Sequence, residues 1–262
     1  MKHIWLLGGF GNVLFQYLMA QVLLEKGKQV KFVSTYTEPS VLTKTIMGLH
    51  IHKPLYDEII NKDDMKRVGW VYAYTVTFLG KLSKILRKHF NWVGYYFNED
   101  LIEEPKSKNI IGYFQSKYFL DKHKEQLVNL GKLLQETYAK TERLPIVVHY
   151  RKGDSDWTRT AQEYDKKILE QLSQESEPIL VVTDDKNKAR ENFKSLPNVY
   201  YSDAKSAIED FSYMVSSQKL YLSSSTFSWW AAHTLPKGTQ IVAPYFLAEE
   251  LGFHSESTVN LL

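Results

Sequence analysis

The chain has 262 residues, with 33 Lys and Arg against 30 Asp and Glu, and this small net charge of +3 indicates no nucleic-acid partner. Cysteine is absent, which excludes disulfides, thiolate metal ligands and cysteine nucleophiles and is compatible with a reducing cytosol. We expect a cytoplasmic protein, because no apolar run reaches the roughly 18 residues of a membrane span and the N-terminus has no signal-peptide pattern.

The N-terminal part of the chain begins with a βαβ pattern. Its apolar residues predict a strand over 3–7, a helix over 12–25 and a second strand over 29–33. Residues 36–110 look irregular and match no pattern, whereas residues 119–140 carry helical spacing.

A glycine-rich loop connects the first strand to the first helix. Gly9, Phe10, Gly11 and Asn12 would bring backbone N–H groups and one polar side chain close to a ligand. The loop lacks the third glycine of the dinucleotide fingerprint, and the second strand ends without the acidic residue that would hold a ribose. We therefore expect a ligand loop that does not bind NAD, with an ordinary tight turn as the alternative.

The segment 81–90 places Leu82, Ile85, Leu86 and Phe90 on one helical face and basic residues on the rest. Such a helix could lie on an anionic membrane. The alternative, which we favour from the sequence, is a surface helix that packs its apolar stripe on the core.

Strands and helices alternate regularly from residue 144 onward. Strands are predicted at 145–150, 178–183, 198–201, 219–223 and 239–243, and helices near 161–173, 186–194, 206–216 and 226–235. This order predicts a doubly wound parallel sheet. The fold class is therefore α/β, with two Rossmann-like halves facing a cleft and a boundary near residue 140, which gives domains over 1–140 and 141–262.

Two basic residues and a histidine end the predicted strand 145–150. Side chains alternate along a strand, so His149 and Arg151 point to one side. Ligands of open α/β sheets bind outside the carboxyl ends of the strands, which makes His149, Arg151 and Lys152 a candidate anion grip. The alternative is a strand end with a solvated arginine before a turn.

A hydroxyl-rich segment follows the predicted strand 219–223. Ser224, Ser225 and Thr226 stand where a helix begins, so they could cap it and hold a phosphate at its N-terminus. Phe227 could stack on a base. Capping alone would need one of these hydroxyls.

Acidic residues also stand at strand ends and helix starts. Asp184 and Asp210 could each accept two parallel donors, such as the N1 and N2 edge of guanine. The alternative for each is an N-cap, and we expect one of Asp184 and Asp185 to cap the next helix. The triplet 154–156 spells the D-x-D of metal-dependent sugar transferases, but it is common by chance, and no metal is expected.

Five segments carry the strongest signal, in the order Gly8–Tyr17, Gly112–Phe119, Val148–Asp154, Thr183–Asp185 and Ser225–Ala232. Together they resemble the motifs of glycosyltransferase family 11, which contains the bacterial and animal α1,2-fucosyltransferases. The resemblance implies a GT-B-like enzyme that transfers L-fucose from GDP-β-L-fucose to a galactoside hydroxyl, with inversion and without a metal or other cofactor.

The resemblance also implies roles for individual residues. Arg151 would bind the β-phosphate with His149 beside the nucleotide, and Asn12 would stand at the reaction centre, so these three are the catalytic candidates. Ser225, Thr226 and Phe227 would hold the phosphates and the base. Asp210 is the candidate for guanine.

Two positions depart from the family pattern. Lys152 stands where the family has a second arginine, and lysine cannot make the planar bidentate contact of a guanidinium. Val13 stands where the family has a glutamine. We expect a point charge to suffice at the first position and Arg151 to keep the main role.

Other activities remain open at this point. A fucosyltransferase of another linkage, or a protein O-fucosyltransferase, would share the donor site, and a non-catalytic nucleotide-binding module would bind the donor without transfer. An NAD-dependent dehydrogenase is the least favoured. The acceptor is expected to be an oligosaccharide or a lipid-linked glycan, reached by peripheral contact with the inner face of an anionic membrane.

Overall fold

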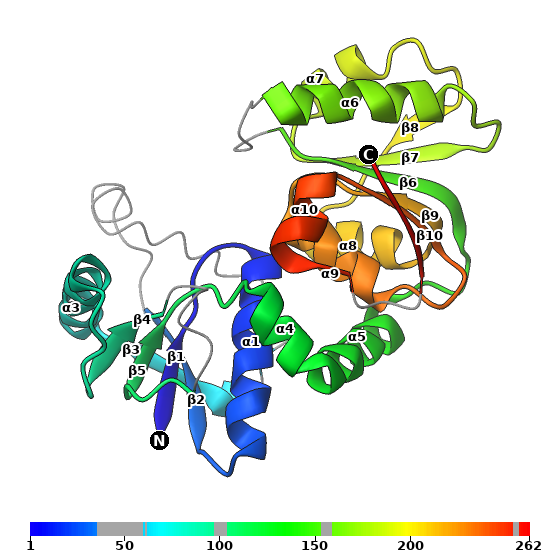
Figure 1. Cartoon of the computed structure of the whole chain (residues 1–262). Coiled ribbons are helices and arrows are strands. Elements are labelled where there is room, and N and C mark those ends of the chain that lie inside the picture. Colours follow the sequence, from blue (N-terminus) through cyan, green and yellow to red (C-terminus); the bar gives the residue numbers. More distant parts are fainter. Residues whose placement is uncertain (36–59, 61, 97–103, 153–158, 254–256) are drawn as a thin grey trace. The chain divides into compact units, whose positions relative to one another are not determined.

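The computed structural model describes residues 1–35, 60, 62–96, 104–152, 159–253 and 257–262. The chain forms two compact units, Met1–Leu127 and Val128–Leu262 (Figure 1). Each unit contains one sheet in which every paired strand is parallel. Within the described ranges, none of the helices combines the length and the apolar character that crossing a membrane requires.

The division between the units falls inside helix α5 (Lys124–Tyr138), earlier than the predicted boundary near residue 140. The second half of this helix packs on the C-terminal unit. A Cβ added to Gly131 would lie 2.7 Å from the carbonyl oxygen of His233, and the ring of Tyr138 meets that of Phe211 edge-on at 5.9 Å. Helical spacing alone does not reveal which unit a helix joins.

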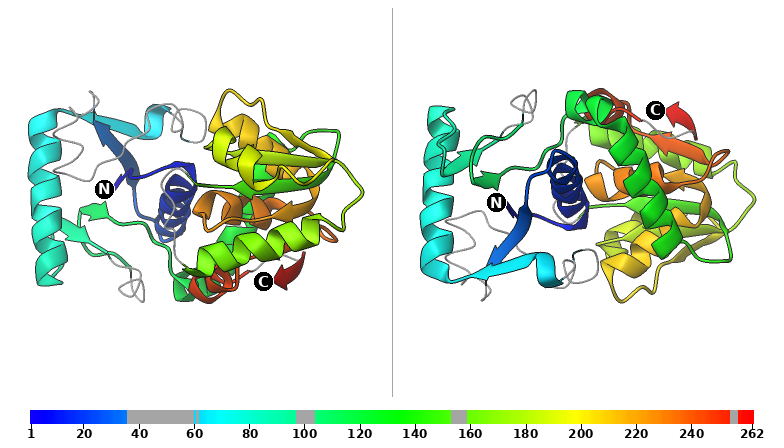
Figure 2. Two further views of the ribbon diagram at one scale, coloured as in Figure 1. Left: turned by 90° about the horizontal axis from the view of Figure 1, so that it is seen from above. Right: turned by 90° about the horizontal axis from the view of Figure 1, so that it is seen from below.

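The N-terminal unit has strand order β3-β2-β1-β5-β4. Its elements are β1 (Lys2–Trp5), α1 (Phe10–Glu25), β2 (Val30–Thr35), the short 3-10 helix η2 (Lys62–Asp64), β3 (Met65–Val68), α3 (Trp70–Leu86), β4 (Val93–Tyr95), β5 (Asn109–Ile111) and α4 (Lys117–Lys122). The predicted βαβ unit is confirmed. Helices α1 and α3 cover opposite faces of the sheet (Figure 2).

The expectation that residues 36–110 are irregular is wrong for the described part of that stretch, which holds β3, α3, β4 and β5. These strands have three or four residues each, too few for alternation to show. Residues 36–59 lie outside the described residues.

The helix predicted over 81–90 ends at Leu86, because Arg87 adopts a left-handed conformation with φ 47°. Phe90 packs against the core beside the sheet, as the favoured interpretation of the apolar stripe requires. That interpretation is wrong for Ile85 and Leu86, whose side chains are exposed. The helical spacing of apolar residues continues in the sequence to Phe90, four residues beyond the end of the helix at Leu86.

The C-terminal unit has strand order β11-β10-β9-β6-β7-β8, which confirms the predicted doubly wound parallel sheet. Its elements are β6 (Leu144–Tyr150), α6 (Arg159–Leu172), β7 (Ile179–Thr183), α7 (Lys186–Asn192), β8 (Val199–Tyr201), α8 (Ala207–Val215), β9 (Ser217–Tyr221), α9 (Thr226–Thr234), β10 (Gln240–Ala243), α10 (Tyr245–Leu251) and β11 (Thr258–Leu261). The last two elements extend one edge and were not predicted.

Strand β6 is buried on both faces, as its run of β-branched residues predicts. Ile146 and Val148 pack with residues of α6 and α7 in one cluster. Because side chains alternate, Val147 and His149 point to the opposite face, where His149 meets α9.

Both sheets share one topological feature. The first strand of each unit is central, and the chain leaves it toward one edge before returning to its other side. The switch points therefore lie between β1 and β5 in the N-terminal unit and between β6 and β9 in the C-terminal unit. Open α/β sheets bind ligands at the carboxyl ends of the strands beside such points.

Candidate active site

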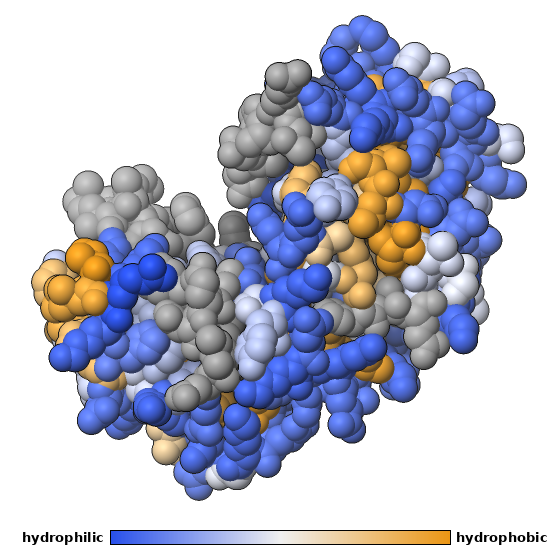
Figure 3. Space-filling model, in the orientation of Figure 1, coloured by the Kyte–Doolittle hydropathy of each residue, from blue (hydrophilic) through white to orange (hydrophobic). Residues whose placement is uncertain are grey.

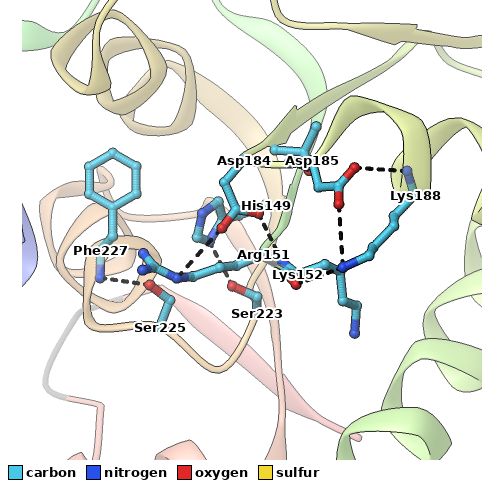
Figure 4. Close-up of polar contacts among 10 residues, drawn as sticks. His149, Arg151, Lys152, Asp184, Asp185, Lys188, Ser223, Ser225 and Phe227 are labelled. Carbon is cyan, nitrogen blue, oxygen red and sulfur yellow. Dashed lines mark hydrogen bonds and ion pairs between the residues drawn. The ribbon is translucent and has the colours of Figure 1, made fainter. Parts of the chain in front are cut away.

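His149 and Ser223 join the two strand ends at the switch point of the C-terminal unit. The Nδ1 atom of His149, at the end of β6, lies 2.7 Å from the hydroxyl oxygen of Ser223, which follows β9 (Figure 4). The ring of Phe227 meets the imidazole edge-on at 5.5 Å. The histidine that the sequence singled out is therefore held in one orientation by a polar and an aromatic neighbour.

Burial is the largest cause that lowers the pKa of His149, to about 3, and the nearby charge of Arg151 adds to it. At neutral pH the imidazole is uncharged and forms hydrogen bonds as a neutral group.

This pKa shift predicts how stability depends on pH. The unfolded chain binds a proton at His149 as the pH falls through the ordinary value of 6.5, whereas the folded chain binds it only near 3. The contribution of His149 to the free energy of unfolding is therefore fully present above pH 6.5. It falls on acidification, by about 2 kcal/mol at pH 5. We expect the free energy of unfolding, measured in urea, to fall less between pH 7 and pH 5 in the His149→Gln variant than in the natural protein. An equal loss in both proteins would contradict the buried neutral state.

Arg151 follows β6 directly and is half-exposed. Its Nε atom lies 3.9 Å from Oδ2 of Asp184, while Oδ1 of the same carboxylate accepts a 2.8 Å hydrogen bond from the backbone N–H of Lys152. Exposed ion pairs at such a distance contribute about 1 kcal/mol or less, so a phosphate could replace the carboxylate at little cost. Asp184 thus orders the turn that carries Arg151.

The two neighbouring aspartates differ in role. Asp185 caps α7, because its side chain accepts a 3.0 Å hydrogen bond from the backbone N–H of Lys188, and this bond lowers the pKa of the carboxyl group. The expectation that one of Asp184 and Asp185 is an N-cap is confirmed for Asp185.

Lys152 is buried and turned toward α6. Its ammonium lies 2.5 Å from Oδ2 of Asp165 and 4.9 Å from the centre of the Tyr150 ring. Burial is the largest influence on the Asp165 carboxyl group and raises its pKa, with Lys152 acting against it. Because Lys152 is committed to this ion pair, Arg151 carries the exposed positive charge of the turn.

A pocket opens at this edge of the sheet. Its lining includes His149, Arg151 and Lys152 from the end of β6, and Ser223 and Ser224 from the end of β9. Side chains of α6 and α10 complete it. The predicted anion grip and the predicted hydroxyl-rich segment therefore meet in one place within the C-terminal unit.

The N-terminus of α9 borders the same edge. Ser225 caps the helix, since its hydroxyl oxygen accepts a 3.3 Å hydrogen bond from the N–H of Phe227, and its own N–H donates to the carbonyl of Ser223 at 2.8 Å. Ser224 is exposed and Thr226 is the first residue of the helix. The cap uses one hydroxyl, and the positive end of the helix dipole faces the strand end.

Asp210 lies in the first turn of α8. It does not cap this helix, because Ser206 does so by accepting from the N–H of Glu209 at 3.2 Å. Its carboxylate accepts a 2.7 Å hydrogen bond from the hydroxyl of Ser202, and burial raises its pKa. The residue after Asp210 is Phe211, and its ring lies 5.7 Å from the ring of Phe227 in α9. Helix α8 therefore packs beside α9 next to Asp210.

The glycine loop occupies the switch point of the N-terminal unit. Gly8 has φ +76°, and a Cβ there would lie 2.2 Å from Nδ2 of Asn12, so only glycine is accommodated. Gly9 ends the loop at the start of α1, where an added Cβ would touch nothing. Phe10 and Gly11 are buried, so the phenyl ring belongs to the core and only its backbone could meet a ligand.

Two glutamines that the sequence reasoning did not single out organise this loop. Gln115, after β5, donates a 2.7 Å hydrogen bond to Oδ1 of Asn12. Gln16 is fully buried, accepts from the N–H of Leu7 at 3.1 Å and donates to the carbonyl of Gly112 at 3.2 Å. A polar residue amid the apolar run of α1 was the available signal for Gln16.

Metal ligands do not gather in the described part of the chain, where no group of three or more His, Asp or Glu side chains could hold an ion. The triplet 154–156 lies outside the described residues.

Comparison with known proteins gives a consistent result. Residues 87–260 match glycosyl transferase family 11. The chain is 23% identical over 263 residues to the O-antigen biosynthesis glycosyltransferase WbnK of Escherichia coli, an alignment that covers 86% of this chain and 87% of the relative.

The fold is similar to those of solved glycosyltransferases. The structure of E. coli heptosyltransferase WaaC with ADP aligns with 100% of this chain and 93% of its own at a TM-score of 0.52 and 10% identity. The structure of fucosyltransferase NodZ from Bradyrhizobium aligns with 90% of this chain and 93% of its own at a TM-score of 0.42 and 12% identity. The predicted GT-B-like α/β fold class is confirmed.

Proposed function

The chain belongs to glycosyltransferase family 11, and from this membership and the site geometry we propose that it transfers L-fucose from GDP-β-L-fucose to a galactoside hydroxyl. The proposed transfer inverts the anomeric centre, forms an α1,2 linkage and needs no metal. The observation that carries the proposal is the meeting of Arg151, the His149–Ser223 pair and the N-terminus of α9 at one switch point.

The leaving group explains why this arrangement suits the reaction. When the bond between fucose C1 and the β-phosphate oxygen breaks, GDP gains negative charge and the sugar becomes oxocarbenium-like. Arg151 can donate charge-assisted hydrogen bonds to the developing anion. The hydroxyls of Ser224 and Thr226 and the positive end of α9 would add to this stabilisation, with Ser225 ordering the helix start.

The base would be recognised beside the phosphates. In the proposal, guanine stacks on Phe227 and donates its N1 and N2 hydrogens to Asp210, which Ser202 already orients through a 2.7 Å hydrogen bond. His149 supports this site as a neutral group that fixes Ser223 and Phe227. In the proposal, Asp184 acts indirectly, because its carboxylate orders the turn that carries Arg151.

The proposal assigns Asn12 to the sugar end of the reaction, with Gly9, Phe10 and Gly11 offering backbone contacts and Gln115 holding the Asn12 amide. We expect Asn12→Ala to lower kcat by about tenfold or more while the affinity for GDP stays within a factor of two, because one positioned polar group is lost from the reacting atoms alone. Steady-state kinetics and GDP calorimetry test this. A parallel loss of GDP affinity would place Asn12 elsewhere.

The acceptor is proposed to be a glycan or a lipid-linked oligosaccharide of a surface polysaccharide. The similarity to a glycosyltransferase named for O-antigen biosynthesis supports this class. A lipid-linked acceptor would bring the enzyme to the inner face of the cytoplasmic membrane. Transfer with another linkage, or to protein, uses the same donor site and is the second candidate.

Turnover of GDP-fucose against a panel of galactosides, with magnesium and with EDTA, tests the function. We expect GDP release that depends on acceptor, equal rates under both conditions, and an α1,2 linkage in the product. GDP-mannose serves as the matched donor control. Binding of GDP-fucose without transfer to any acceptor would show that the protein is a non-catalytic nucleotide-binding module. A rise in the melting temperature with NAD but not with GDP would indicate a dehydrogenase.

A further inference from the structure

Helix α3 presents two different faces. Its inner face packs on the sheet through buried Ala73, Val76 and Ser83. The opposite face is apolar and exposed, with exposed fractions of 59% at Val71, 52% at Tyr74, 58% at Phe78 and 77% at Ile85. Figure 3 shows hydrophobic side chains gathered over α3.

The spacing of these four residues makes them one surface. Steps of three, four and seven residues return to the same side of an α-helix, so Val71, Tyr74, Phe78 and Ile85 form a continuous stripe, called here the α3 stripe. An aromatic pair within an apolar row is typical of helices that lie at the boundary between lipid headgroups and acyl chains.

The charged residues of α3 and of the segments next to it in the sequence have one sign. Residues 65–96 contain no Asp or Glu, although the whole chain has 30 of them. The same stretch contains six Lys and Arg, and the structure shows all of them exposed: Lys66, Arg67, Lys81, Lys84, Arg87 and Lys88. A helix whose own charged residues and sequence neighbours are all basic, beside an apolar stripe, complements an anionic surface.

We propose that α3 lies on the surface of an anionic lipid bilayer, with the α3 stripe at the headgroup boundary and Lys81, Lys84, Arg87 and Lys88 on lipid phosphates. A second copy of the chain suits this face less well, because self-association would bring these basic residues together. The proposal deepens the proposed function by giving a lipid-linked acceptor a membrane to which the enzyme binds. The contact itself does not depend on which sugar is transferred.

Vesicle co-sedimentation tests the proposal with phosphatidylcholine vesicles, with and without phosphatidylglycerol. We expect the full chain to bind only the anionic vesicles and to release them at high salt. Phe78→Ser/Ile85→Ser should lower the partition coefficient by about tenfold or more, since two apolar side chains no longer leave water. Replacing Lys81, Lys84, Arg87 and Lys88 with glutamine should abolish binding.

The matched control is Tyr118→Ser/Leu133→Ser, which removes two other exposed apolar side chains outside α3 and should bind as the natural protein does. Transfer to a soluble galactoside by the α3 variants separates this proposal from the enzymatic one, because membrane contact should be lost while that activity persists. Equal vesicle binding by natural protein and α3 variants would overturn the proposal. Concentration-dependent dimers that Phe78→Ser/Ile85→Ser abolishes, without vesicle binding by the natural protein, would show a second copy as the occupant.

Discussion

Replacing Arg151 with lysine is expected to lower kcat for fucosyl transfer by about 100-fold or more. Lysine keeps the charge but loses the planar fork that can donate two parallel hydrogen bonds to a phosphate. Removing one donor that stabilises charge in a transition state typically has an effect of about this size. Lys152 cannot compensate, because its ammonium is buried against Asp165 at 2.5 Å.

The matched control for this substitution is Arg190→Lys. Arg190 is an exposed residue of α7 in the same unit, where its guanidinium lies 5.6 Å from the Tyr201 ring. It undergoes the same chemical change away from the pocket, so its activity should stay near that of the natural protein. Steady-state GDP release checks both variants, with circular dichroism confirming the fold. A folded Arg151→Lys enzyme with nearly natural kcat would remove Arg151 from the centre of the proposed mechanism.

The C-terminal unit was predictable because its strands carry a strong local signal. Strand β6 is a long apolar run covered on both faces, and the elements from β6 to β10 fall within two residues of their predicted bounds at every end. Once the strand order is fixed, the carboxyl ends of β6 and β9 must be neighbours. The sequence therefore supplied His149, Arg151 and Ser224 as candidates, and the strand order brings them together.

The parts that could not be predicted depend on contacts between distant residues. Short strands such as β4 form because they pair with neighbouring strands. A strand of three residues is too short to show the alternation of apolar and polar side chains that predicts a strand. Gln115 reaches Asn12 from 103 positions away, and Asp165 meets Lys152 across the gap between a strand end and a helix. Of the α3 stripe only Ile85 was singled out from the sequence, because the apolar residues of this stripe face away from the core, against the usual direction of the pattern.

The ion pair between Lys152 and Asp165 is expected to matter more for folding than for chemistry. The side chains are only 6% and 17% exposed, so both charges have left water and depend on each other. We expect Asp165→Leu to lower the free energy of unfolding by about 3 kcal/mol or more, because it leaves an ammonium buried without its carboxylate.

A double variant distinguishes the pair from general packing damage. Replacing both charges in Lys152→Met/Asp165→Leu should restore most of the lost stability, because apolar side chains of similar size often replace a buried pair at little cost. Urea unfolding of the natural protein, both single variants and the double variant completes the cycle. If the two single losses simply added in the double variant, the residues would not be coupled, and Lys152 would be available to join Arg151 on the phosphate.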